Sequence, residues 1–169
     1  MNVLFAAGTQ FPFPRLDQVV LSVARQRPAW PLVYQAGPGA SLQRFESLAN
    51  VKVQPLFEAE DYRQLFAVAD LVVTHAGMGN ILACLEQGKP LMMLPRRAGL
   101  KEHRNDHQQD TAEAIANLYS VPFYEEVDSL IAAILAYDGA APDRAPLEES
   151  IRSQRQAFGK KLNALIRTL

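Results

Sequence analysis

The sequence predicts an α/β fold in which helices cover both faces of a parallel sheet. Short apolar runs alternate with longer segments whose apolar residues recur about every three to four positions, as strands alternate with helices in such folds. The run Leu91–Leu94 is wholly apolar, as expected of a strand that is buried on both faces. A length of 169 residues fits a single domain with its own core.

The composition excludes several classes of protein. Hydrophobic residues make up 49% of the chain and charged residues 21%, which excludes intrinsic disorder and low-complexity architecture. Seventeen basic and eighteen acidic residues give a net charge of −1, so no nucleic-acid partner is expected. The single cysteine, Cys84, excludes an internal disulfide and favours a cytoplasmic location. No apolar run approaches the roughly 20 residues of a membrane-spanning helix, so any membrane role is expected to be peripheral.

The first half of the chain is expected to contain three strands. The first, Asn2–Ala7, ends in a glycine turn, and a helix with one apolar face follows two prolines. The second strand, Leu32–Gln35, is closed by the turn Ala36–Gly39, where two glycines permit a sharp change of direction. Val51–Phe57 has the composition of a third strand.

The middle of the chain repeats this alternation. A short helix, Asp61–Ala69, leads into the fourth strand, Leu71–Thr74. The next helix begins near His75 and ends at Gly88, just before a proline, which is a common helix ending. Leu91–Leu94 then forms the fifth strand, so this region supplies two further strands with a helix between them.

The last third is expected to add mostly helices. Asp106–Leu118 has helical periodicity, Val121–Tyr124 is expected to form a short sixth strand, and Val127–Tyr137 a further helix. Gly139–Pro146 resembles a surface linker. The final segment, Leu147–Leu169, predicts a basic amphipathic helix. We therefore divide the chain into a lobe, residues 1–146, and a C-terminal helix, residues 147–169.

Two glycine-containing turns are candidate ligand sites, because ligands bind beyond the carboxyl ends of strands in open parallel sheets. Gly8 and Thr9 follow the first strand and offer bare backbone and a hydroxyl to a phosphate, although an ordinary turn has the same pattern. The turn after the fourth strand is more specific. Gly77 and Gly79 allow a ligand to approach the start of a helix closely, and the free N–H groups and dipole there favour a diphosphate. His75 can add a hydrogen bond or a charge. The alternative is that both glycines only pack helix against strand.

A third polar segment, Glu102–Asp110, precedes and begins the next helix. A solvated surface is the usual explanation of such a run, but its hydrogen-bonding groups also suit sugar hydroxyls. His103 and His107 are four residues apart, yet no third ligand accompanies them, so we expect no metal site. The basic residues just before, Arg96, Arg97, Lys101 and Arg104, fit an acidic donor, an anionic lipid or a solvated loop.

Together these motifs resemble the C-terminal domain of glycosyltransferase family 28, over about residues 1–137. The similarity is greatest to single-domain subunits, of the bacterial exopolysaccharide glucuronosyltransferase type and of the cytosolic type from the dolichol-linked chitobiose-forming N-acetylglucosaminyltransferase. The matching segments are Ala7–Thr9, Phe11–Leu16, Asp70–Asn80, Leu85–Pro90, Leu94–Arg97, Glu102–His103 and Asn105–Gln108.

The resemblance implies a Rossmann-like lobe equivalent to the C-terminal half of a GT-B transferase, which binds the nucleotide-sugar donor, usually a UDP-sugar. No metal or other cofactor is implied. Two such lobes need roughly 300 residues, so the acceptor lobe is expected on a partner. In the family this partner is a membrane-associated subunit that holds a lipid-linked acceptor, which would place the chain at the inner face of the membrane. The helix Leu147–Leu169 could dock on that partner or pack on its own lobe.

The resemblance also implies which residues contact substrate. It places the first glycine turn near the cleft, the second around the diphosphate, and His107 and Gln108 on the hydroxyls of the donor sugar. The expected substrate-binding residues are Gly8, Thr9, His75, Gly77, Met78, Gly79, Asn80, Glu102, His107 and Gln108. No catalytic base is assigned on this chain, because the family implies that the partner carries it.

Two positions depart from the family pattern. Asn80 stands where Ser or Thr is common, and Ala83 where the family has a Glu that contacts the ribose; Glu86 follows almost one turn later. The expected activity is that of an inverting hexosyltransferase, in exopolysaccharide or other glycan biosynthesis. The alternatives are a non-catalytic scaffolding or regulatory subunit, which the alanine favours, and a nucleotide-sugar epimerase or hydrolase.

Overall fold

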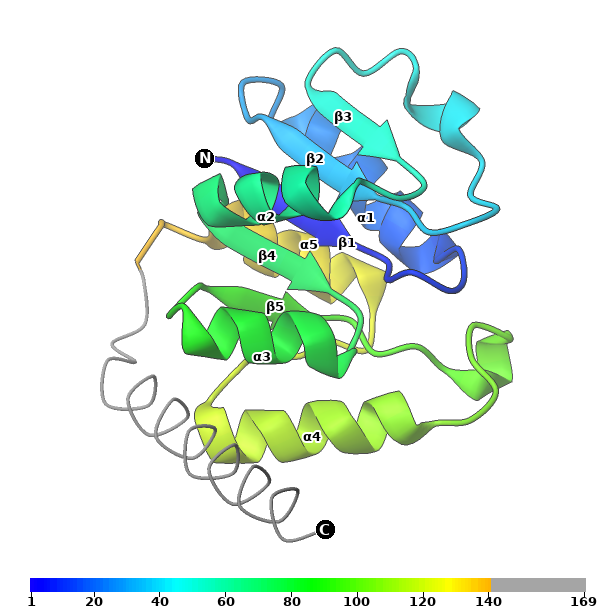
Figure 1. Ribbon diagram of the computed structural model, residues 1–169, viewed down its shortest axis with the longest axis vertical. Helices are drawn as coiled ribbons and strands as arrows, with labels where there is room; N and C mark the ends of the chain where they lie inside the picture. Colours follow the sequence, from blue (N-terminus) through cyan, green and yellow to red (C-terminus); the bar gives the residue numbers. More distant parts are fainter. Residues whose placement is uncertain (141–169) are drawn as a thin grey trace, which may run out of the picture.

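A computed structural model describes residues 1–140, and within them five parallel strands form one sheet (Figure 1). The strand order is β3-β2-β1-β4-β5, and every pairing is parallel. This confirms the predicted α/β class. The strands are β1 Val3–Ala6, β2 Leu32–Gln35, β3 Val51–Gln54, β4 Leu71–Thr74 and β5 Leu91–Met93.

Helices cover both faces of the sheet, and the core is correspondingly divided into two clusters. On one face α1 and α5 pack against each other and the sheet, and on the other lie α2, α3 and α4 (Figure 1). The bounds are α1 Pro14–Gln26, α2 Ala59–Val68, α3 Met78–Glu86, α4 His107–Tyr119 and α5 Val127–Ala136, with short 3₁₀ turns η1 Leu42–Phe45 and η2 Ala98–Leu100. No helix among these residues is long and apolar enough to cross a membrane.

The central strand shows why the sequence folds this way. Along β1, Val3 and Phe5 point into the cluster under α1 and α5, whereas Leu4 points into the opposite cluster. All three are at most 1% exposed, so an uninterrupted apolar run is what a strand covered on both faces requires. The edge strand β3 differs, since Lys52 and Gln54 are exposed there. A charged residue on an edge strand discourages pairing with another sheet.

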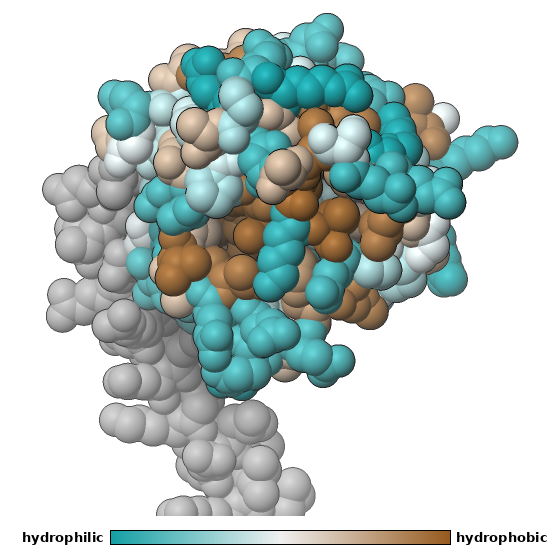
Figure 2. All heavy atoms as spheres, turned by 90° about the horizontal axis from the view of Figure 1, so that it is seen from above, coloured by the Kyte–Doolittle hydropathy of each residue, from teal (hydrophilic) through white to brown (hydrophobic). Residues whose placement is uncertain are grey.

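Figure 2 shows the molecule from above, at the β3 end of Figure 1. Hydrophobic residues gather near the centre of this face, and hydrophilic ones surround them. An apolar patch bordered by polar residues is therefore visible on this side of the described chain.

Proline limits two of the predicted strands. The third was expected to reach Phe57 but ends at Gln54, because Pro55 lacks the N–H that would continue the ladder. The expected sixth strand, Val121–Tyr124, is reduced to a single bridge between Phe123 and Met93. Pro122 accepts a hydrogen bond there through its carbonyl but has no N–H to donate.

The C-terminal elements of the sequence prediction lie outside the described residues. These are the helix Leu147–Leu169 and all but the first two residues of the linker Gly139–Pro146. The proposed division at residue 146 therefore stays a prediction.

The strand order defines the position of the site. The chain passes from β1 outward to β2 and β3, then returns to β4 on the other side of β1. The loops that follow β1 and β4 consequently diverge to opposite sides of the sheet. A crevice between their carboxyl ends is the usual ligand site of a doubly wound sheet.

Candidate nucleotide-sugar site

A cavity of about 680 Å³ opens at the carboxyl ends of β1 and β4. It lies where the strand order reverses, and its size is in the range of small-molecule sites. Of the residues expected to bind substrate, eight line this cavity: Gly8, Thr9, His75, Gly77, Met78, Gly79, Asn80 and Gln108. The other two, Glu102 and His107, lie outside it.

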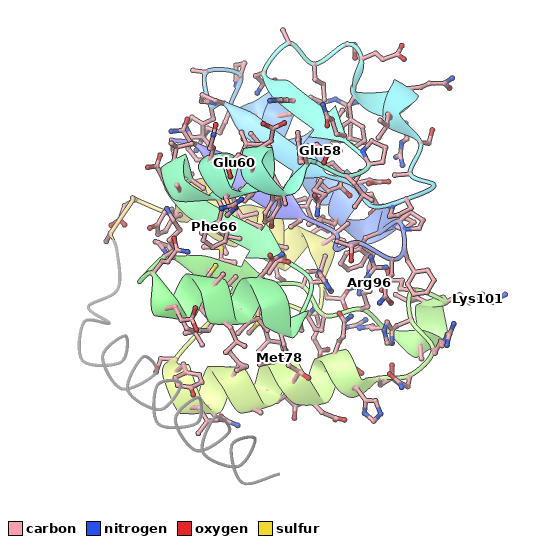
Figure 3. The ribbon with its side chains drawn as sticks, in the orientation of Figure 1. Glu58, Glu60, Phe66, Met78, Arg96 and Lys101 are labelled. Atoms are coloured by element: carbon pink, nitrogen blue, oxygen red, sulfur yellow. The ribbon has the colours of Figure 1, made fainter. Side chains whose placement is uncertain are left out.

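The start of α3 supplies the polar wall of the cavity. Gly77 is the N-cap residue and forms no side-chain cap, and its own N–H donates to the carbonyl of His75 at 2.7 Å. The N–H groups of Met78, Gly79 and Asn80 belong to the first turn, where a helix offers no internal acceptor. The dipole of the helix adds partial positive charge at this point. Figure 3 labels Met78 at this end of α3, and its side chain is 46% exposed.

The His75 ring fills the space between the two glycine turns. Its Nδ1 lies 3.4 Å from the carbonyl oxygen of Ala6 and 3.3 Å from Oγ1 of Thr74, which leaves Nε2 on the side of the glycines. A Cβ added to Gly8 would be 2.7 Å from Cε1 of this ring, and one added to Gly77 would overlap Nε2. Both positions therefore need glycine for the imidazole to fit.

The charge of His75 is set by its surroundings. Burial, followed by the nearby positive charge of Arg96, lowers its pKa to about 4. The imidazole is consequently neutral at pH 7. Of the two contributions expected from the sequence, a hydrogen bond or a charge, the folded protein retains the hydrogen bond at neutral pH.

Asn80 braces the start of α3 against its neighbours. Its amide nitrogen donates to Oγ1 of Thr74 at 3.0 Å, and its amide oxygen accepts from the hydroxyl of Tyr62 at 3.0 Å. Thr74 in turn donates to the carbonyl of Ala6 at 3.0 Å. Burial raises the pKa of Tyr62, so this hydroxyl remains protonated as the donor. The side chain of Asn80 thus positions the turn, and its backbone N–H is the group offered to the cavity.

Arg96 is a cavity residue that the sequence analysis placed only in a basic loop. Its side chain is buried, and its guanidinium donates at 2.7–3.1 Å to the carbonyls of Ala7, Phe11, Pro12 and Glu102. It also stacks on the Phe13 ring, 4.4 Å from the centroid. Arg96 therefore ties the loop after β1 to the loop after β5. Figure 3 shows it at this end of the sheet.

Glu102 and His107 have other surroundings. Glu102 is buried, and its carboxylate accepts from Nε and Nη2 of Arg15 at 2.8 and 2.6 Å and from the N–H of Arg97 at 3.0 Å. His107, the first residue of α4, is exposed and lies 3.6 Å from Asp110. Glu102 is thus a structural ion-pair residue. Contact of either side chain with substrate stays a prediction.

The basic loop carries less free charge than its composition indicates. Arg96 is committed to carbonyl groups, and Arg97 pairs with Glu125 at 3.0 Å and Glu126 at 3.2 Å. Lys101 and Arg104 are exposed and form no ion pair within residues 1–140.

The sequence analysis missed the side of the cavity under α2. Gln35, Phe57, Tyr62 and Arg63 line it there, and the side-chain oxygen of Gln35 accepts from the N–H of Phe57 at 3.1 Å. Gln35 is the last residue of β2, and Phe57 lies shortly after the end of β3. Because ligands bind beyond the carboxyl ends of parallel strands, the predicted strands could have indicated both residues. Ala83 does not line the cavity and packs half-buried against the core.

No Asp or Glu is among the residues that line the cavity within the described part of the chain. The same residues, 1–140, contain no group of three His, Cys, Asp or Glu side chains that could hold a metal ion. The cavity is thus walled by backbone N–H groups, amides, neutral imidazole and arginine, a set that suits an anionic ligand.

The chain belongs to the family described as the glycosyltransferase family 28 C-terminal domain, whose model matches residues 2–164. A search of curated protein sequences finds no match.

Several solved structures share the fold. The glycotransferase of kitacinnamycin is 24% identical with a TM-score of 0.73; the alignment covers 99% of this chain and 43% of that one. MurG of Acinetobacter baumannii is 19% identical with a TM-score of 0.59, covering 99% and 50%. ALG13 is 22% identical with a TM-score of 0.60, covering 87% and 89%. The chain therefore spans about half the length of the first two but nearly all of the third.

Proposed function

We propose that this chain is the donor-binding subunit of a two-component inverting glycosyltransferase, which takes a UDP-sugar and acts on a lipid-linked acceptor in polysaccharide or glycan biosynthesis. Membership of the family supports a transferase. The observation that carries the proposal is the cavity at the strand reversal, with the free N–H groups of α3 and the His75 imidazole on one wall.

The diphosphate of the donor binds at the start of α3. Backbone N–H groups of Met78, Gly79 and Asn80 are aligned there with the helix dipole, an arrangement that binds phosphate in many proteins. Gly77 has no side chain to obstruct the approach. Neutral His75 contributes a hydrogen bond, and Gly8 leaves room beside it.

The remaining parts of the donor extend to the two sides of the diphosphate. The nucleoside lies toward Phe57 and Tyr62, where an aromatic wall suits a base, and the sugar lies toward Gln108. Gln108 accepts from the N–H of Arg96 at 3.1 Å through Oε1, so its NH₂ group remains for a sugar hydroxyl.

The transfer is an in-line displacement at the anomeric carbon. An acceptor hydroxyl attacks from the face opposite the diphosphate, the bond from carbon to phosphate oxygen breaks, and UDP leaves with the electron pair. The helix terminus stabilises the charge that develops on the diphosphate. The hydroxyl proton passes to a base on the partner. Support comes from the absence of a carboxylate in the described cavity and from the low pKa of His75, which makes that ring a weak base.

The proposal of a partner draws on the similarity to ALG13. The alignment covers 89% of ALG13, whereas it covers 43% and 50% of the two larger neighbours. The partner would be a membrane-associated subunit that binds the acceptor, and it would hold this chain at the inner face of the membrane. The segment Leu147–Leu169 is the proposed contact.

A second candidate is a scaffolding subunit that keeps the fold without binding donor. Ala83 favours it, because the family position for a ribose-binding glutamate has no polar group here and lies half-buried against the core.

Calorimetric titration of the purified chain separates the two. UDP, UDP-glucose, UDP-N-acetylglucosamine and UDP-glucuronate are compared on the native chain, on His75→Ala and on Leu118→Ala, whose leucine is 70% exposed and lies outside the cavity. We expect saturable binding that His75→Ala weakens by about five- to tenfold, as expected for one lost hydrogen bond, and that Leu118→Ala barely changes. Absence of binding at millimolar ligand, both alone and with a partner subunit, would favour the scaffold.

A further inference from the structure

We infer that Thr74 is a positioning residue for donor binding: its hydroxyl sets which nitrogen of the His75 ring carries the proton, and an anionic ligand in the cavity moves that proton to Nε2. This rests on the proposed function, because the ligand is the diphosphate of the donor. Thr74 is the last residue of β4 and is 0% exposed. It does not line the cavity, so any effect on binding has to pass through the residues that it contacts.

Three polar atoms meet beside the His75 ring. The hydroxyl oxygen of Thr74 lies 3.0 Å from the carbonyl oxygen of Ala6 and 3.3 Å from Nδ1 of His75, and Nδ1 lies 3.4 Å from the same carbonyl. The amide nitrogen of Asn80 donates to the Thr74 oxygen at 3.0 Å. A threonine hydroxyl has a single proton to donate, and two acceptors are within its reach, the Ala6 carbonyl and the imidazole.

In the free chain the hydroxyl of Thr74 donates to Ala6, which is the nearer of the two acceptors. Nδ1 of His75 then faces two oxygen atoms that have no proton for it, so the neutral ring carries its own proton on Nδ1. Nε2, on the side of the glycine turns, is consequently a bare acceptor. A lone pair at this position repels a phosphate, so this arrangement does not suit the donor.

Rotation of one hydroxyl gives the arrangement that binds an anion. When Thr74 donates to Nδ1 of His75 across the 3.3 Å contact, the ring proton belongs on Nε2 and can bond to a phosphate oxygen. The Ala6 carbonyl still accepts from the backbone N–H of His75 at 3.4 Å. The ring is neutral in the free chain, since its pKa is about 4. It stays neutral in the exchange, because one proton leaves Nδ1 to water and one arrives at Nε2 from water.

The packing of the His75 ring restricts the ligand to this choice. Gly8 and Gly77 lie so close to the Cε1 and Nε2 edge that a methyl group on either would clash with it. A ring turned over in place would set the carbon Cδ2 against the two oxygen atoms and lose both polar contacts. The tautomer of the ring, and not its orientation, is therefore what the ligand changes.

Nitrogen-15 NMR of the imidazole rings measures the tautomer directly, and the chain has three histidines to assign. We expect the proton of His75 on Nδ1 in the free chain and on Nε2 at saturation with UDP-glucose. This probe is a diphosphate diester, whose own charge does not change near neutral pH. The same tautomer with and without UDP-glucose, or protons on both nitrogens in the complex, would overturn the inference.

Affinity for UDP-glucose tests the role of Thr74. Thr74→Val keeps the shape of the side chain but removes the hydroxyl, so Nδ1 of His75 has no donor when the proton is on Nε2. Binding should weaken about five- to tenfold, as for one lost hydrogen bond. Thr74→Ser restores the hydroxyl and should recover most of the affinity. Thr111→Val is the matched control, because this threonine on α4 donates to the carbonyl of His107 at 2.7 Å and lies outside the cavity.

A double-mutant cycle separates the effect on the ring from the effect on Asn80, whose amide also loses its acceptor in Thr74→Val. In the His75→Ala background, Thr74→Val should weaken UDP-glucose binding by less than about twofold, because no ring is left to position. An undiminished loss in that background would assign the effect to Asn80 and the start of α3, and the inference would be wrong.

The two proposals fail in different ways. If UDP-glucose does not bind, the donor proposal is lost and this inference is lost with it. If UDP-glucose binds while the tautomer of His75 stays the same, or while the loss from Thr74→Val persists without the ring, the donor proposal stands and only this inference is lost.

Discussion

Replacing Arg96 by methionine should destabilise the protein more than any other single change in the loops around the cavity. The substitution keeps an unbranched apolar side chain but removes the guanidinium, which leaves four carbonyls, those of Ala7, Phe11, Pro12 and Glu102, without their donor. Each hydrogen bond from a charged group contributes about 1.5–3 kcal/mol, but such contributions are not additive. Removal of one side of a buried charged network costs about 3–5 kcal/mol, and this is the expected loss in free energy of unfolding.

Urea unfolding followed by circular dichroism measures this loss. Arg97→Met is the matched control, because the adjacent arginine makes only surface ion pairs, with Glu125 and Glu126 at 3.0 and 3.2 Å, which are worth at most about 1 kcal/mol. Arg96→Lys should fall between the two, since an ammonium lacks the planar fork of the guanidinium. UDP affinity should fall with Arg96→Met, because the loop that carries Gly8 loses its anchor. If Arg96→Met is no more destabilising than Arg97→Met, the role given to this residue is wrong.

Three further predictions concern the interior around the site. Gly77→Ala should cost about 1–3 kcal/mol in urea unfolding, because the new methyl overlaps the His75 ring, whereas Gly79→Ala, with nothing within 4 Å, should be neutral or slightly stabilising; equal effects would contradict the packing described. Because the pKa of His75 is lowered from 6.5 to about 4, the unfolded chain binds the extra proton first as pH falls, and stability should drop by about 2–3 kcal/mol between pH 7 and 4.5. His75→Gln should remove that part of the drop, and a variant with the same pH dependence as the native chain would refute the assignment. Tyr34→Phe should cost about 1–3 kcal/mol in thermal or urea unfolding, because the buried Asp17 carboxylate loses a 2.6 Å hydrogen bond; an unchanged midpoint would contradict this.

The strands could be predicted from the sequence because a turn of polar residues or glycines follows directly after an apolar run. Leu71–Thr74 ends where His75 and the glycines begin, and its predicted bounds are those observed. The prediction was wrong where proline removes an N–H, as at Pro55 and Pro122, since a period-two apolar pattern does not report on hydrogen bonding.

The candidate site was predicted where one turn holds both the glycines and the polar residue. His75 and Gly77 lie two residues apart, and their contact follows from that turn. Arg96 was not distinguished from its solvated neighbours, because three of the carbonyls that bury it lie 84–89 positions earlier in the chain. Glu102 was expected to bind substrate, and its ion pair with Arg15 was not foreseen, because Arg15 is 87 positions away. Partners at such separations are set by the tertiary fold and leave no local pattern.

Amide NMR of the purified chain during addition of UDP tests the central claim most directly. If the start of α3 binds the diphosphate, the backbone amides of Met78, Gly79 and Asn80 should show the largest shifts, and Gly77→Ala should abolish them. The exposed amides of α5, on the far face of the sheet, should not move. Saturation that shifts residues elsewhere and leaves these three amides in place would contradict the account.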